Sequence, residues 1–154
     1  MKRVILFASL LILAGLTTGF KQQYNKGVNA KGEKMYLGTA DIESSDAFKN
    51  YKRSPQGEAD KQRYLFERLK NAKHLEFYHD GGWYNSLEAF RGGMWLMRNR
   101  YKKGFPTRDF IKQYVERSEA GNLHLAKYPD GSSQIGSYIL YNELDLLESK
   151  AKKS

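Results

Sequence analysis

The chain of 154 residues contains no cysteine, carries a formal net charge of +9 and is 40% hydrophobic. Its length predicts one domain. The lack of cysteine excludes disulfide bonds, cysteine nucleophiles and cysteine-ligated zinc sites.

Residues 1–19 follow the pattern of a secretory signal peptide. Lys2 and Arg3 precede an apolar run over residues 4–16, and small residues suit cleavage after Gly19. The apolar run is shorter than the roughly 20 residues that a membrane-spanning helix needs. The alternative is that the segment is not cleaved and anchors the protein in a membrane; no other membrane contact is predicted. The segment predicts a periplasmic or secreted protein.

The mature chain divides into a leader and one domain. Residues 20–53 are poor in aliphatic residues and rich in Lys, Gly, Asn and Ser, which predicts an irregular leader. Disorder of this leader and its docking on the domain through Tyr36–Leu37 and Phe48–Tyr51 both stay open. Residues 54–150 form the predicted domain.

The centre of the domain holds both tryptophans and a turn sequence, Asp80–Gly81–Gly82. Alternation predicts a strand over residues 75–78 before this turn. Asn85 then caps a helix, with Glu88 as its capping-box partner. Gly92–Gly93 lies inside this helix and favours either a helix break or the close approach of a second backbone. The apolar residues at helical spacing, which predict the buried stripe of this helix, are Leu87, Phe90, Met94, Met97 and Tyr101.

Periodicity predicts the elements on either side of this centre. Helices are expected over residues 56–73, from a cap at Thr107 to Gly121, and over residues 133–150, with a second strand over residues 123–128. The strands are too short to stand alone, so we expect them to pair against a helical layer. The predicted fold class is a small α+β domain of about four helices with a short two-stranded β element.

A series of short motifs extends across the domain. The sequence Phe77–Gly81 is followed at fixed distances by Tyr84 and Ala89. Further along the chain stand Thr107, Phe110–Ile111, Ser118 and Gly121. Over about residues 58–147 this pattern resembles domain-of-unknown-function family 5329, which comprises small uncharacterised bacterial periplasmic or envelope proteins. Asp80 replaces the asparagine of that pattern, and Gly92 stands where the family has a helical histidine. The resemblance implies an envelope location and fold, and no agreed activity.

A metal-binding hypothesis centres on His79. His74, Glu76 and Asp80 are close to it in sequence, and His124 joins them if the two strands pair. Strand alternation, however, points His74 and Glu76 away from His79. We therefore predict no metal site and no cofactor.

Hydrolysis is the second chemical hypothesis. Ser86 or Ser118 with His79 and Asp80 would supply the residue types of a catalytic triad, but no nucleophile-elbow motif is present. The carboxylates available for glycan cleavage are Glu76, Asp80, Glu88 and Glu119, and their spacing favours no pair. We assign no catalytic residue, and a small envelope hydrolase or metal-dependent enzyme centred on His79 stays the alternative.

Basic residues gather where the central helix ends. They are Arg98, Arg100, Lys102, Lys103, Arg108 and Lys112, with Tyr101 and Phe105 between them. These residue types suit phosphate contacts and base stacking. Export makes an acidic protein the better partner, so no nucleic acid is expected.

The turn before the central helix is the predicted contact surface. It carries Asp80, Trp83 and Tyr84, and Trp and Tyr commonly anchor protein interfaces. The basic residues expected to steer an acidic partner toward it are Arg98, Arg100, Lys102 and Lys103. We predict an exported, non-catalytic binding protein with a protein partner, of the inhibitor, immunity or envelope-adaptor type. The sequence predicts no oligomeric state.

Overall fold

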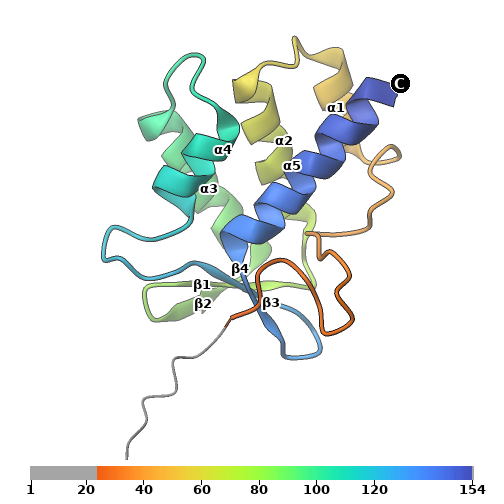
Figure 1. Cartoon of the computed structure of the whole chain (residues 1–154). Helices are drawn as coiled ribbons and strands as arrows, with labels where there is room; N and C mark the ends of the chain where they lie inside the picture. The colour runs from red at the N-terminus through yellow and green to blue at the C-terminus, as the bar shows by residue number, and fades with distance from the viewer. Residues whose placement is uncertain (1–23, 154) are drawn as a thin grey trace, which may run out of the picture.

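Helices pack on one side of a small antiparallel sheet in the computed structural model, which describes residues 24–153 (Figure 1). The predicted fold class, a mostly helical α+β domain, is confirmed. The signal peptide predicted over residues 1–19 lies outside the described residues. Within residues 24–153, no helix is long and apolar enough to cross a membrane.

Side-chain caps set the starts of three of the helices. The helical segments are α1 (Asp46–Arg53), α2 (Glu58–Asn71), α3 (Ser86–Arg100), α4 (Thr107–Phe110), a π-helical turn (Ile111–Val115) and α5 (Gly136–Lys153). Ser45 accepts a backbone N–H at the start of α1, and Asn85 and Glu88 form the predicted capping box of α3. α2 begins later than predicted, because Asp60 accepts the N–H of Gly57 at 3.1 Å and caps the helix there.

The sheet has four antiparallel strands in the order β2-β1-β3-β4, where the sequence predicts two. They are β1 (Glu76–His79), β2 (Gly82–Tyr84), β3 (Leu125–Lys127) and β4 (Ser133–Ile135). β1 and β3 correspond to the predicted strands. β2 follows directly on the turn, and Ile135 of β4 fits the helical spacing of the segment that comes next. Because β4 occupies the predicted start of the last helix, that helix begins only at Gly136.

A two-residue turn joins β1 to β2. His79 pairs with Gly82, and between them Asp80 and Gly81 have positive φ angles of 41° and 90°. Positive φ at both turn positions is the type I′ geometry, which Asp-Gly sequences favour because it matches the twist of the strands. The turn therefore fixes Asp80 directly beside His79 at one end of the hairpin.

The described part of the leader packs on the domain, as the docking alternative predicts, and residues 24–45 contain no named helix or strand. α1 occupies its end. Leu37, Ile42, Phe48 and Tyr51 are buried in the core. These few apolar anchors are widely spaced among polar residues, so composition alone does not indicate that the segment packs.

A buried ion pair connects the leader to α2 and α5. Glu143 Oε1 accepts hydrogen bonds from Arg68 at 3.0 Å and from the backbone N–H of Leu37 at 2.7 Å. The Glu143 side chain is fully buried. A buried carboxylate needs such partners to offset its lost hydration, so these bonds specify where the leader lies.

α3 contacts α2 through a glycine. The ring of Phe66 lies against Gly93, where a Cβ atom would come within 2.4 Å of it. Close approach therefore explains Gly93, although the neighbour is a ring rather than a backbone. The helix is not broken at the two glycines and continues through Gly92. The predicted buried stripe is wrong at Leu87, which is 41% exposed. The residues of α3 that are buried are Ser86 and Gly93, so this helix places no large side chain fully in the core.

Candidate functional site

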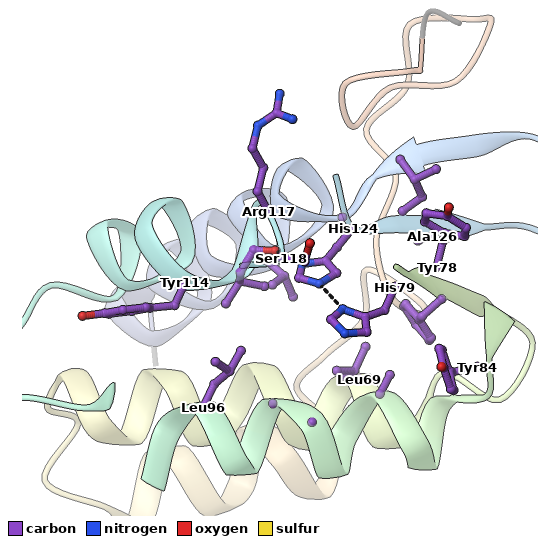
Figure 2. A pocket seen from close by; sticks show the side chains of 18 of the residues that line it. Leu69, Tyr78, His79, Tyr84, Leu96, Tyr114, Arg117, Ser118, His124 and Ala126 are labelled. Atoms are coloured by element: carbon purple, nitrogen blue, oxygen red, sulfur yellow. Dashed lines mark hydrogen bonds between the residues drawn. The ribbon is translucent and has the colours of Figure 1, made fainter. Parts of the chain in front are cut away.

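A cavity of about 760 Å³ separates α3 from the segment around the π-helical turn, with the sheet at one end (Figure 2). Its walls are mostly apolar and include Leu69, Phe77, Leu96, Tyr114 and Ile139. Small-molecule sites commonly have volumes of about 300–1,000 Å³ and walls of this kind. The cavity explains why α3 buries no large side chain: much of its inner face covers open space.

Two histidines meet at the polar end of this cavity (Figure 2). Tyr78 of β1 pairs with Leu125 of β3, and the same antiparallel register places His79 opposite His124. His79 Nδ1 lies 2.7 Å from His124 Nε2. The ring planes are within 16° of parallel and the ring centroids are 4.9 Å apart. Since the nitrogens are much closer than the centroids, the rings meet edge to edge through a hydrogen bond.

The backbone determines which nitrogen carries each hydrogen. His124 Nδ1 lies 2.5 Å from the carbonyl oxygen of Val115. A carbonyl oxygen can only accept, so His124 Nδ1 is the donor and, in the neutral ring, His124 Nε2 is an acceptor. His79 must then donate from Nδ1, which leaves His79 Nε2 as the basic nitrogen of the pair.

The π-helical turn supplies that carbonyl. Glu116 donates its backbone N–H to Ile111, a π-type bond of five residues, and the helix ends there. Val115 is the last residue of the turn, and its carbonyl oxygen binds His124. Single π-helical turns often occur at functional sites, and here the turn orients a side chain on a neighbouring strand.

Burial keeps His124 neutral. Removal from water lowers the pKa of His124 below its ordinary value, an effect that the Val115 hydrogen bond opposes and the nearby His79 reinforces. His124 is therefore an acceptor toward His79 at neutral pH. The His79 side chain is 54% exposed, so it is the member of the pair that solvent and ligands can reach.

Asp80 is held as a carboxylate next to the pair. Its Oδ1 accepts hydrogen bonds from the Ser118 hydroxyl at 2.5 Å and from the Asn122 amide at 2.9 Å. The Ser118 bond, followed by the Asn122 bond, lowers the pKa of Asp80. Its Oδ2 lies 3.5 Å from His79 Nε2, too far for a good hydrogen bond.

These contacts do not form a serine-protease arrangement. Ser118 donates to Asp80 rather than to a histidine, so no base is placed to activate its hydroxyl. Ser86 is buried in the first turn of α3. Among residues 24–153, no group of three or more His, Asp or Glu side chains is arranged to hold a metal ion.

The carboxylates considered for glycan cleavage have separate partners. Glu76 pairs with Lys127 at 2.6 Å, and Glu119 pairs with Arg100 at 3.3 Å. Glu88 accepts the Asn85 N–H in the capping box of α3. Asp80 is the member of this group that lies beside His79.

The residues predicted to contact a partner fall at two ends of α3. Trp83 and Tyr84 precede it and are each 41% exposed. Arg98 and Arg100 are in its last turn, with Lys102–Lys103 just beyond. At 1.5 Å per residue, the 15-residue helix is about 22 Å long, so the aromatic and basic groups do not form one patch.

Three of the predicted contact residues line the cavity instead. They are Asp80, Tyr84 and Arg100. The nearby indole of Trp83 packs under the Lys127 ammonium, whose Nζ lies 4.4 Å from the ring centroid. Sequence reasoning overlooked Val115 and Asn122, whose roles depend on a carbonyl orientation and a loop contact. The meeting of His79 and His124 was foreseeable from strand register.

Comparison of the chain with protein-family models, with curated proteins and with solved structures found no match. The resemblance to domain-of-unknown-function family 5329 therefore stays a prediction.

Proposed function

We propose that this protein binds a small, largely apolar molecule in the cavity between α3 and the π-helical turn. The observation that carries the proposal is the cavity itself, an apolar space of about 760 Å³ with convergent polar groups at one end. Such a combination is the usual form of a ligand site. Filling it with a ligand would remove apolar wall surface from water, which favours binding by about 25 cal/mol per Å².

Gly92 supports the proposal independently. It lies in the interior of α3 and lines the cavity. A Cβ atom placed there would meet no atom within 4 Å. A helical glycine costs about 1 kcal/mol relative to alanine, and the fold offers no packing reason for this cost at Gly92. A ligand that approaches the helix backbone would supply one.

A neutral fluorescent probe tests the proposal. N-phenyl-1-naphthylamine is titrated into the full chain, into Gly92→Phe, which fills the cavity, and into Arg91→Phe as the matched control. Arg91 is exposed and does not line the cavity. We expect saturable enhancement in the wild type and in Arg91→Phe, and its loss in Gly92→Phe. Equal enhancement in all three proteins would place the probe elsewhere and contradict the proposal.

A protein partner is the second candidate function. It is favoured by the exposure of Trp83 and Tyr84 on β2, a strand at the open edge of the sheet. The partner would be an acidic protein of the cell envelope, met after export. A tagged full chain is used to capture proteins from an envelope extract at low and high salt. A stoichiometric acidic protein that survives moderate salt and is lost with Trp83→Ala supports this candidate, and captures lost at high salt contradict it.

A further inference from the structure

We infer that the cavity takes a ligand with a hydroxyl group, which donates a hydrogen bond to His79 Nε2. This inference rests on the proposed function and specifies the chemistry of its ligand. The ligand is an apolar alcohol or phenol: its hydrocarbon body lies along the cavity, and its hydroxyl lies at the histidine pair.

The hydrogen-bond chain sets the polarity of the site. The Val115 carbonyl fixes a hydrogen on His124 Nδ1, and His124 Nε2 in turn fixes a hydrogen on His79 Nδ1. The chain ends at the lone pair of His79 Nε2, on a side chain that is 54% exposed and lines the cavity. Asp80 Oδ2 lies 3.5 Å from this nitrogen. That atom is also an acceptor when ionised, so the neutral pair presents two adjacent acceptors and calls for a donor.

Three side chains near these acceptors donate their hydrogen bonds elsewhere. The Ser118 hydroxyl and the Asn122 amide both donate to the other oxygen of Asp80. Arg117 donates to the carbonyl of Gly121 at 2.9 Å and points away from the histidines (Figure 2). A ligand hydroxyl would therefore provide the hydrogen that His79 Nε2 lacks.

Charge selects a neutral donor over an ionic one. A carboxylate at this end would face the Asp80 carboxylate, whose hydrogen bonds keep it ionised. An ammonium would have to leave water for a mostly apolar cavity. Moving an ion out of water costs far more than moving a hydroxyl that gains a hydrogen bond.

Three probes with one apolar body test the inference: 4-hexylphenol, its methyl ether 4-hexylanisole, and 4-hexylbenzoate. Each is titrated by calorimetry into the full chain, into His79→Phe, and into His74→Phe as a control at an exposed histidine outside the cavity. We expect the phenol to bind about five- to tenfold more tightly than the ether, as one net hydrogen bond allows. His79→Phe should bring this ratio near one, and His74→Phe should leave it unchanged.

The outcomes separate this inference from the proposed function. Equal binding of phenol and ether, or tightest binding of the benzoate, overturns the hydroxyl inference and leaves a cavity that binds apolar molecules. No saturable binding of any probe overturns both. The ¹⁵N chemical shift of His79 Nε2 in the wild type provides a readout that does not depend on a variant folding. It should move with the phenol and not with the ether, and the reverse result contradicts the inference.

Discussion

Gly92 and Gly93 are adjacent in one helix, and the structure predicts opposite effects when each is changed to alanine. Both lie in the interior of α3, so alanine improves helix propensity at either position by about 1 kcal/mol. The difference arises from the surroundings. A Cβ at Gly92 meets nothing within 4 Å, whereas a Cβ at Gly93 comes within 2.4 Å of two ring carbons of Phe66.

The magnitudes follow from these distances. Gly92→Ala should stabilise the protein by the propensity gain alone, about 1 kcal/mol, which raises Tm by about 3 °C for a chain of this size. At Gly93 the Phe66 ring is itself buried, at 4% exposure, and cannot move aside easily. Overpacking of a core costs about 1–3 kcal/mol. Because the 2.4 Å approach is severe, we expect this cost to exceed the helix gain and Gly93→Ala to be less stable than the wild type.

Urea unfolding followed by far-ultraviolet circular dichroism gives both values on one scale. The m value must stay constant for the free energies of unfolding to be compared. A stabilised Gly92→Ala beside a destabilised Gly93→Ala is the expected result. Destabilisation by Gly92→Ala would refute the reasoning, since it would mean that α3 packs closely at this residue and that no open cavity adjoins it.

Three further predictions concern the buried and titrating groups. Ser118→Ala should raise the pKa of Asp80 toward its ordinary value, measured by carboxyl ¹³C NMR titration; an unchanged pKa would show that the Ser118 bond is weak. The pKa of His124 is lowered in the folded state, so as the pH falls the unfolded chain protonates this residue at a higher pH than the folded protein does. The free energy of unfolding should therefore fall as pH decreases through about 6.5, and this slope should be reduced in His124→Asn; an equal slope contradicts the assignment. Arg68→Met leaves the buried carboxylate of Glu143 without its charged partner and should cost about 3–5 kcal/mol in urea unfolding, whereas a loss below about 1 kcal/mol would argue against burial of the pair.

The strong local signals in the sequence predicted much of the fold. The capping box of Asn85 and Glu88 and the Asp80–Gly81 turn depend on neighbouring residues, and both are present. The strand β2 was missed because it follows directly on the turn, and β4 because Ile135 fits the helical spacing of the segment that follows. The sequence left disorder and docking of the leader open, because its anchoring depends on Glu143, more than 100 residues away in the sequence.

The candidate site was only partly predictable for a similar reason. Sequence spacing identified His79 and Asp80 and allowed His124 to join them if the strands paired. It could not indicate that Ser118 donates to Asp80 rather than to a histidine, because this depends on the path of a loop. The cavity has no local signature at all. Its one sequence sign is Gly92, a helical glycine whose open surroundings become visible only in three dimensions.

The central claim is that the cavity between α3 and the π-helical turn binds an apolar molecule. It is tested most directly by NMR. A ¹⁵N-labelled full chain is titrated with 4-hexylphenol, and amide shifts are followed in the wild type and in Gly92→Phe. We predict saturable shifts centred on Gly92, Leu96 and His79 in the wild type, and their loss in the filled variant. Shifts that do not saturate, or that persist unchanged in Gly92→Phe, would contradict a ligand site in this cavity.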